Sequence, residues 1–322
     1  MDATDFAIYR YLSPDGLVRF WASRRLVDPR VSAREVADRV GLSEAGARAR
    51  LRSLKEQGLL RGTEVRPNPS LFGATTVMAE VPIQTPGESA RLFRDLSDVD
   101  GVMFARDILD EEDRKVCVYY VSDTAGATTR RTSLLRRFSP TGEVRGPTPY
   151  WIPASSHTPT ALDWRLLAVF RRHPDETLAH WSTESGVSLK TTARRFGALL
   201  DSRACWWSHG SDSEEWPLAL LQVSLQPGAD PAEVSAQLGR QNETWLPVAT
   251  DGFGVAPGQR DQPLAGLVPV ERPAALERVV RRTLELGGVA NVRRTFGLGS
   301  ATYTDWVDDQ LARHLPATRE AR

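Results

Sequence analysis

Residues 41–60, GLSEAGARARLRSLKEQGLL, decide the fold of the N-terminal part of this chain. The stretch reads as a tight turn, a helix N-cap at Ser43, a basic amphipathic helix and a glycine stop at Gly58. The serine hydroxyl can accept a hydrogen bond from an unpaired backbone N–H of the first helical turn. Glycine adopts the left-handed conformation that ends many helices at little cost. The stretch therefore predicts one short helix with both ends marked in the sequence.

The two faces of this predicted helix differ in chemistry. Its apolar residues recur at i, i+4 and i+7 and are Ala47, Leu51 and Leu54. On a helical wheel Arg48 and Arg52 lie away from that stripe, and Arg50 lies at its flank. One face is expected to pack inward while the other presents guanidinium groups, which is the form of a DNA recognition helix. A basic face that only meets solvent would have the same composition, so the flanking sequence has to separate the two interpretations.

The residues around the stretch favour DNA recognition. Ser32 and Glu35 have the spacing of a capping box, which predicts a helix over residues 33–40. Two helices joined by a corner that contains glycine form the helix-turn-helix arrangement. Three further elements are predicted beside it: helices at residues 6–12 and 17–27, and a strand at residues 59–65 that forms a wing with the turn at residues 67–69.

The charge of the whole chain conceals a basic N-terminal region. The 322 residues include 41 Lys and Arg and 41 Asp and Glu, so the formal net charge is zero. Residues 17–66, however, contain 12 basic and 6 acidic side chains, a local excess of six positive charges. A nucleic-acid partner would therefore be bound by a local patch rather than by the protein as a whole.

Composition also limits the class of protein. Cys117 and Cys205 lie far apart and form neither a disulfide framework nor a zinc-ligand spacing. The N-terminus lacks the basic and apolar regions of a signal peptide. No window approaches the roughly 18 apolar residues that a membrane-spanning helix needs. We expect a cytoplasmic protein with no membrane contact.

Residues 68–153 follow a different pattern. Strand-like segments rich in β-branched residues alternate with helical ones in the order β-α-β-β-α-β, which is typical of the ferredoxin-like fold. Residues 152–160 are mostly small and polar and include two prolines, which predicts a linker at residues 154–160. The six predicted segments are residues 75–83, 88–96, 101–109, 115–121, 125–138 and 142–152.

The chain then begins the same order again. At a constant offset of 145 residues, Thr177 matches Ser32, Gly186 matches Gly41, Ser188 matches Ser43, and Phe196 and Leu199 match Leu51 and Leu54. A shared offset without gaps across three helices indicates an internal repeat. A second β-α-β-β-α-β series follows at residues 218–225, 231–241, 245–255, 264–270, 272–286 and 289–298, with a helical tail at residues 300–315.

These observations predict an α+β protein in which two winged helix-turn-helix modules alternate with two ferredoxin-like modules. The boundaries that we expect are an N-terminal winged helix-turn-helix at residues 1–67, a first ferredoxin-like module at 68–153, the linker at 154–160, a second winged helix-turn-helix at 161–216, and a second ferredoxin-like module with its helical tail at 217–322.

Residues 28–60, DPRVSAREVADRVGLSEAGARARLRSLKEQGLL, resemble the DNA-binding part of the Lrp/AsnC (feast/famine) family of transcription regulators. Residues 68–73, NPSLFG, resemble the hinge after the wing in that family, and residues 289–296, VANVRRTF, resemble its final strand. A usual member has one helix-turn-helix and one ligand-sensing module. Here two successive copies of this arrangement together cover nearly the whole chain, which implies a tandem-duplicated form.

The resemblance also implies a ligand and an assembly. The α+β module of the family is similar to ACT domains and usually binds an amino acid or a similar small effector between subunits. Its middle strands are commonly joined by a Gly-Asp-aromatic-Asp turn, which neither residues 109–115 nor residues 252–261 retain, so the effector-binding residues are unknown. We expect a homo-oligomer in which the paired modules of one chain form an internal pseudo-dimer.

The predicted partner is double-stranded DNA. Arginine suits bidentate contact with guanine, while phosphate contacts fix the register of the protein on the duplex. The residues predicted to contact DNA are Ser32, Arg34, Ser43, Glu44, Arg48, Arg50 and Arg52 in the first module, and Lys190, Thr191, Arg194 and Arg195 in the second. Residues 161–209 hold seven basic and five acidic side chains, so the second module either binds DNA weakly or serves in assembly.

Enzymatic interpretations have less support, and we expect no catalytic residue, metal or cofactor. The five histidines lack a His-x-x-x-His spacing, and no serine or cysteine lies in a nucleophile elbow. Siroheme decarboxylases resemble this family in fold and some are tandem fusions, but their His-Asn-Tyr and Asn-Leu-Trp segments are not visible here. The alternatives kept open are such a tetrapyrrole enzyme and a small-molecule sensor that does not bind DNA.

Overall fold

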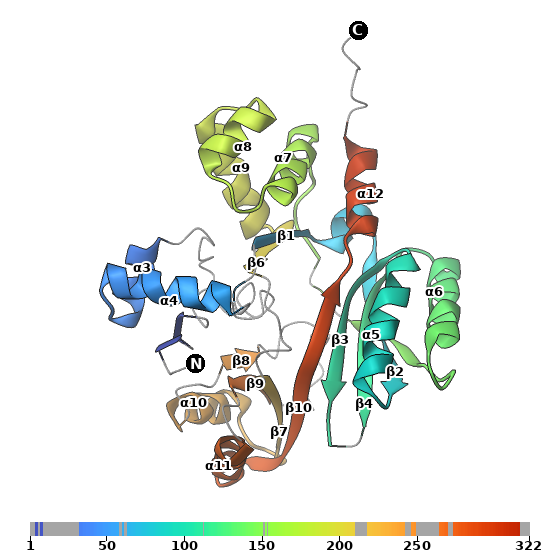
Figure 1. Ribbon diagram of the computed structural model, residues 1–322, viewed down its shortest axis with the longest axis vertical. Helices are drawn as coiled ribbons and strands as arrows, with labels where there is room; N and C mark the ends of the chain where they lie inside the picture. The colour runs from blue at the N-terminus through green and yellow to red at the C-terminus, as the bar shows by residue number, and fades with distance from the viewer. Residues whose placement is uncertain are drawn as a thin grey trace.

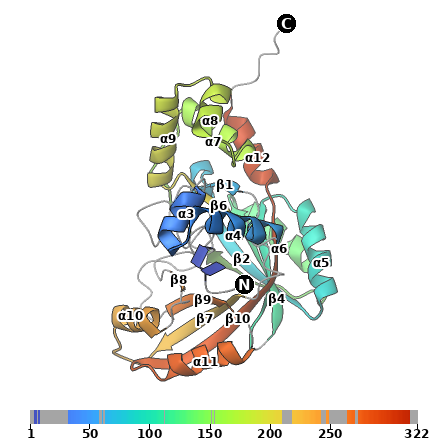
Figure 2. The same ribbon diagram turned by 60° about the vertical axis from the view of Figure 1, so that its left-hand side comes forward.

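The computed structural model describes residues 4, 5, 7, 8, 32–57, 60, 63–111, 113–150, 152, 154–209, 218–241, 246–248, 264–269 and 273–315 (Figures 1 and 2). The structure is a mixed α/β protein with a helix-turn-helix domain near the N-terminus and a curled antiparallel sheet. The helices predicted at residues 6–12 and 17–27 lie largely or wholly outside the described residues, as does Gly58. None of the described helices is long and apolar enough to cross a membrane.

The described helices and strands have the following bounds. The helices are α3 (Ala33–Val40), α4 (Glu44–Glu56), α5 (Pro86–Asp95), α6 (Ala125–Phe138), α7 (Ala161–Arg172), α8 (Leu178–Ser185), α9 (Leu189–Asp201), α10 (Pro231–Gln241), α11 (Pro273–Leu284) and α12 (Asp305–His314). The strands are β1 (Thr63–Pro67), β2 (Thr75–Ile83), β3 (Val102–Leu109), β4 (Arg114–Ser122), β5 (Arg145–Tyr150), β6 (Cys205–His209), β7 (Leu218–Leu225), β8 (Leu246–Val248), β9 (Leu264–Pro269) and β10 (Val289–Thr302).

The ends of α3 and α4 are formed by the residues that the sequence marks. The Ser32 hydroxyl accepts a hydrogen bond from the Glu35 N–H, and the Glu35 carboxylate accepts one from the Ser32 N–H at 2.7 Å. Gly41 ends α3 in the left-handed conformation with φ 72°. The Ser43 hydroxyl caps α4 by accepting from the Gly46 N–H at 3.1 Å. A small core lies between the helices and is formed by Ile8, Val36, Ala37, Ala47, Leu54 and Leu60.

The same local devices recur 145 residues later. Thr177 caps α8, Gly186 ends it with φ 64°, and Ser188 caps α9. The core beneath these helices is larger and more aromatic than the first: Phe170, Trp181 and Phe196 lie with ring centroids 4.5–5.3 Å apart. Aromatic pairs at these separations contribute beyond their buried area.

The strand predicted as part of a wing pairs with a distant partner. Strand β1 runs antiparallel to β6, with Val65 opposite Trp207, so the strands that follow α4 and α9 form one two-stranded sheet. The Asn68 side chain donates to the Arg203 carbonyl at 2.9 Å, and the Asn68 N–H donates to the Ala204 carbonyl at the same distance. Backbone pairing therefore connects the segment that follows α4 directly to the segment that follows α9.

The eight-stranded sheet has the order β5-β2-β4-β3-β10-β7-β9-β8, and all its pairs are antiparallel. Its first four strands come from the first half of the chain and its last four from the second. Helices α5 and α6 lie beside the first set, and α10 and α11 beside the second (Figures 1 and 2). Each set has its own core, because leucines of the covering helices pack on alternate residues of the strands.

Strand β10 joins the two sets and is longer than predicted. The sequence indicates a strand over residues 289–298 and a helix over residues 300–315, but the strand continues to Thr302 and α12 begins only at Asp305. Residues 289–296 pair with β7, and residues 296–302 pair with β3. The added residues therefore stay extended because β3 offers them a partner. Arg294 supports the junction by binding Glu111 of the first half at 3.0 Å and Glu277 of α11.

The turn before β3 depends on a glycine and a buried arginine. Gly101 has φ 84°, and a Cβ atom there would lie 2.5 Å from Nε of Arg131. Arg131 is only 5% exposed and donates to the carbonyls of Asp100 and Val121 and to the carboxylate of Asp123. The guanidinium group therefore occupies the space that the missing side chain leaves and cannot move without breaking several hydrogen bonds.

We predict that Gly101→Ala lowers the free energy of unfolding. The left-handed backbone alone should cost about 1–2 kcal/mol, and displacement of Arg131 should add to that cost. Gly87→Ala, in the first turn of α5 where the nearest atom would lie 3.9 Å away, is the matched control and should be neutral or slightly stabilising. Urea unfolding followed by circular dichroism would measure both, and equal midpoints for the two variants would contradict the prediction.

Candidate nucleic-acid interface

The exposed side of α4 carries a stripe of small and basic residues. Ala45, Arg48, Ala49 and Arg52 fall at i, i+3, i+4 and i+7 and are all exposed, while Ala47 and Leu54 are buried on the opposite side. The two alanines add little bulk beside the arginines. This surface can therefore approach the edges of bases in a major groove while the guanidinium groups reach bases or phosphates.

Arg48 is paired within the helix, but weakly. Its Nη2 lies 2.6 Å from Oε1 of Glu44, one turn earlier, and the two side chains are 65% and 49% exposed. Exposed ion pairs of this i,i+4 type contribute only about 0.3–0.5 kcal/mol. A phosphate could therefore replace Glu44 as the partner of Arg48. Glu44 itself lies in the first turn, where a carboxylate interacts favourably with the helix dipole.

The structure separates the remaining predicted residues of this module into two groups. Arg34 and Arg52 are exposed, and neither has a hydrogen-bond or ion-pair partner among the described residues. Arg50 differs, because its Nη1 binds the Asp5 carboxylate at 2.6 Å and its side chain is only 33% exposed. Ser32 and Ser43 are engaged as helix caps. Arg34, Arg48 and Arg52 are consequently the cations best placed to meet a ligand.

Helix α9 presents a different surface. At the 145-residue offset, Lys190 and Arg194 occupy the positions of Ala45 and Ala49, whereas Ala193 and Gly197 occupy those of Arg48 and Arg52. Lys190 and Arg194 are exposed. The Thr191 hydroxyl accepts a hydrogen bond from Ser188 at 3.0 Å. Both helices thus offer two outward cations, but at positions shifted along the helix face.

Arg195, predicted to contact DNA, points instead toward a buried carboxylate. Asp163 is fully buried and accepts hydrogen bonds from the Thr160 N–H at 2.8 Å and the Thr160 hydroxyl at 2.7 Å. Nε2 of His157 lies at 3.2 Å and Nη1 of Arg195 at 3.4 Å. Burial tends to raise the pKa of Asp163, but the hydrogen bonds from Thr160 and His157 and the charge of Arg195 together lower it.

Asp163 therefore fixes the segment that composition predicts to be a linker. Residues 154–160 contain no helix or strand, yet the Ser155 N–H donates to the Ser70 hydroxyl and the Ser156 N–H donates to the Ser202 carbonyl. Thr160 and Asp163 form a capping box at the start of α7. The Thr-x-x-Asp spacing is the sequence signal that could have revealed this attachment.

Nucleophilic chemistry has little support in the described residues. Cys117 and Cys205 are buried, and burial raises the pKa of each thiol to about 12, so neither is a thiolate at neutral pH. The acidic turn after β3 is neutralised by cations: Lys115 binds Asp110 at 2.7 Å, and Arg145 binds Asp113 at 2.5 Å. These carboxylates form the structural hairpin that the sequence indicates.

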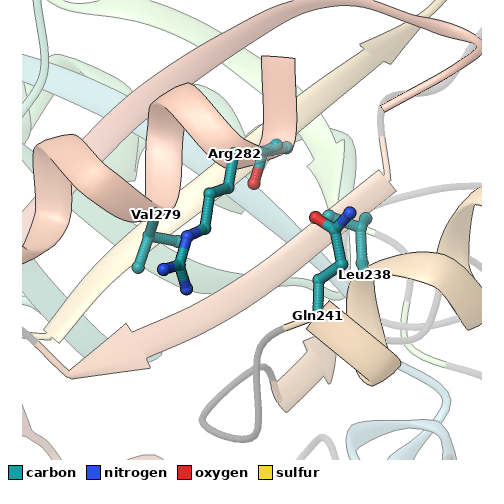
Figure 3. Close-up of a pocket in the computed structure, with 5 residues that line it drawn as sticks. Leu238, Gln241, Val279 and Arg282 are labelled. Carbon is teal, nitrogen blue, oxygen red and sulfur yellow. The ribbon is translucent and has the colours of Figure 1, made fainter. Parts of the chain in front are cut away.

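One small cavity lies between α10 and α11 (Figure 3). Leu238 and Gln241 border it from α10, and Val279 and Arg282 border it from α11. Its volume is about 30 Å³, which is room for about one water molecule. Pockets that bind small organic ligands are typically about 300 Å³ or larger. This cavity therefore does not supply a place for an amino-acid effector.

Comparison with known proteins agrees with the geometry of α3 and α4. The family model for winged helix-turn-helix DNA-binding domains matches residues 26–61. The chain contains a winged helix-turn-helix domain. No curated protein matches the chain.

The solved structures show a likeness over a longer part of the chain. The siroheme decarboxylase NirDL is similar over 93% of this chain and 99% of its own, with 10% identity and a TM-score of 0.50. The leucine response regulatory protein LrpA of Mycobacterium tuberculosis is 22% identical over 45% of this chain and 88% of its own, with a TM-score of 0.30. At 10% identity the first likeness shows a shared overall fold, and the TM-score of the second is too low to support a conclusion.

We predict that Asp163→Asn destabilises the protein in a pH-dependent manner. The folded-state pKa of Asp163 lies below the ordinary value of about 3.9, so its carboxylate stabilises the fold above about pH 4 and loses that contribution as the pH falls further. Hydrogen bonds to a charged group contribute about 1.5–3 kcal/mol. Free energies of unfolding from urea titrations of the two proteins should differ by an amount of this order at neutral pH and converge in acid.

Asp201→Asn, at the exposed end of α9, is the control and should resemble the wild type at every pH. A gap between wild type and Asp163→Asn that stays constant or widens in acid would show that the charge of Asp163 is not responsible.

Proposed function

We propose that this protein is a sequence-specific transcriptional regulator of Lrp/AsnC type that binds double-stranded DNA through α4. The observation that carries the proposal is the exposed stripe of α4 that contains Arg48 and Arg52. The helix has a serine N-cap and a buried opposite face, as a recognition helix does. It lies inside the segment that matches winged helix-turn-helix DNA-binding domains. The small residues between the arginines support insertion into a groove rather than contact with phosphates alone.

The same proposal includes a tandem organisation. The recurrence of caps at Ser32 and Thr177, and at Ser43 and Ser188, supports two helix-turn-helix units. Each half of the sheet is formed by strands and helices that follow one another in the order β-α-β-β-α-β. This order supports two ferredoxin-like modules that take the place of two subunits within one chain. A small amino-acid-like effector, assembly into homo-oligomers and the absence of enzymatic activity belong to this proposal.

The two helix-turn-helix units should contribute unequally. Arg195 is directed to Asp163, and the α9 positions equivalent to Arg48 and Arg52 carry Ala193 and Gly197, whose side chains cannot hydrogen-bond to a base. The remaining cations, Lys190 and Arg194, suit phosphate contacts. Helix α4 would therefore determine sequence preference, while α9 adds affinity that depends mainly on charge.

A second candidate function is a siroheme decarboxylase-like tetrapyrrole enzyme. The similarity of fold to NirDL over 93% of this chain favours it, and a shared fold by itself does not determine activity. The sequence does not show the His-Asn-Tyr and Asn-Leu-Trp segments of that class. The regulator is therefore the better-supported proposal.

Arg48→Ala and Arg52→Ala should each weaken binding to a DNA fragment selected from genomic DNA. Removal of one arginine–phosphate interaction should lower the slope of log affinity against log salt by about 0.9. Removal of a bidentate interaction with a base should cost about 1–3 kcal/mol and relax specificity at one position. Fluorescence anisotropy at several salt concentrations measures both effects.

Arg91→Ala, an exposed arginine of α5, serves as the matched control and should leave binding unchanged. Arg194→Ala should reduce affinity equally for specific and random DNA. Wild-type affinity in both the Arg48 and Arg52 variants would remove α4 from the interface.

The tetrapyrrole candidate is tested by mixing the protein with siroheme or iron-uroporphyrin and recording the absorption spectrum. The proposed regulator should leave the Soret band of the free tetrapyrrole unshifted. A shifted band that saturates at one equivalent per chain would favour the enzyme instead.

A further inference from the structure

Three potential metal ligands come together where α7 meets α8. His173 is the C-cap residue of α7, and His180 and Glu184 lie one turn apart on α8. Oε2 of Glu184 lies 3.1 Å from Nε2 of His173 and 3.2 Å from Nε2 of His180. The three ligand atoms, one from each residue, all lie within 4.8 Å of one another.

These separations are close to those of a metal site. Zinc binds histidine nitrogen and carboxylate oxygen at about 2.0–2.2 Å with tetrahedral geometry, which places neighbouring ligand atoms about 3.3–3.5 Å apart. The two nitrogen–oxygen distances already approach this value. We propose that His173, His180 and Glu184 form a binding site for a divalent transition metal, with Zn²⁺ as the favoured ion.

Charged groups lie beside two of the three ligands. Nη1 of Arg172 donates to Oε1 of Glu184 at 2.6 Å, which leaves Oε2 to face the two histidines. Nδ1 of His180 lies 3.9 Å from a carboxylate oxygen of Glu176, on the side of the ring opposite Nε2. Ligating histidines commonly turn their second nitrogen toward a carboxylate, and ligating carboxylates are themselves hydrogen-bonded.

The backbone that carries the ligands is well fixed. Nε1 of Trp181 donates to the His173 carbonyl at 2.7 Å, and the Trp181 side chain is fully buried against Phe170 and Phe196. The cap residue of α7 and the first turn of α8 are thereby held together before any ion binds. Metal binding would cost little conformational entropy, because the site is largely preorganised.

The set of donors determines the kind of ion. Imidazole suits zinc, copper and nickel, whereas magnesium and calcium prefer oxygen ligands alone. The three side chains are between 24% and 42% exposed, so a water molecule can reach a fourth coordination position. Binding would connect the end of α7 to α8, which leads into α9, and would so stabilise the second helix-turn-helix unit whether or not that unit contacts DNA.

Titration of the metal-free protein with Zn²⁺ tests the site. We expect one high-affinity equivalent per chain by isothermal titration calorimetry, and visible absorption bands of tetrahedral intensity when Co²⁺ is used instead. Glu184→Gln and His173→Ala should each weaken binding at least tenfold and abolish the Co²⁺ bands. Glu176→Gln, which removes only the negative charge beside the His180 ring, should weaken binding by about tenfold.

Glu285→Gln, an exposed carboxylate outside the cluster, is the matched control and should retain the wild-type affinity. Circular dichroism confirms folding of each variant, and His180→Gln replaces Glu184→Gln if the latter loses helicity. A Zn²⁺ concentration of about 100 µM lies far above the dissociation constants of structural zinc sites. Failure of the wild-type protein to bind Zn²⁺ at that concentration would overturn the proposal. Binding that persists unchanged in Glu184→Gln and His180→Gln would do the same.

Discussion

The structure depends on the backbone pairing of β10. Its first residues complete the sheet of the second half beside β7, and its last residues add to the sheet of the first half beside β3. Helix α12 follows directly and packs on α7, where Arg171 binds Asp308, and the ring of His314 stacks on Trp164 at 4.3 Å. One continuous segment therefore connects both halves of the sheet to α7. Because ladder hydrogen bonds form in register along a strand, this segment fixes the relative position of the parts it joins.

Local signals in the sequence predict the elements well, and distant pairing is what they miss. The bounds of α3, β2, α6, β7 and α10 agree with prediction, because caps, glycines and periodicity act within a few residues. The extension of β10 to Thr302 is not predicted, because residues 299–302 contain no strong strand pattern and become extended only by pairing with β3. The pairing of β1 with β6 is missed for the same reason, since a wing is expected to pair locally.

The candidate interface shows the same division. A helical wheel places Arg48 and Arg52 on the exposed face of α4, and the structure agrees. The helical wheel cannot show that Arg50 forms an ion pair with Asp5 or that Arg195 forms one with Asp163, because each acid is distant in sequence or on another helix. The histidine cluster is missed for a related reason. His173 and His180 are seven residues apart across a helix end, a spacing that becomes a cluster only when the two helices pack.

The order of the strands has a consequence for symmetry. The halves meet through unlike strands, the second strand of one series and the fourth of the other, so the junction is heterologous rather than two-fold. Among the described strands, such a contact leaves unlike edges, β5 and β8, and repeating it between chains would lengthen the sheet without closing it. Both edges resist this growth, because β5 contains Pro147 and Pro149 and β8 is three residues long with Pro247 at its centre. Neither edge of the described sheet therefore favours pairing with a second chain.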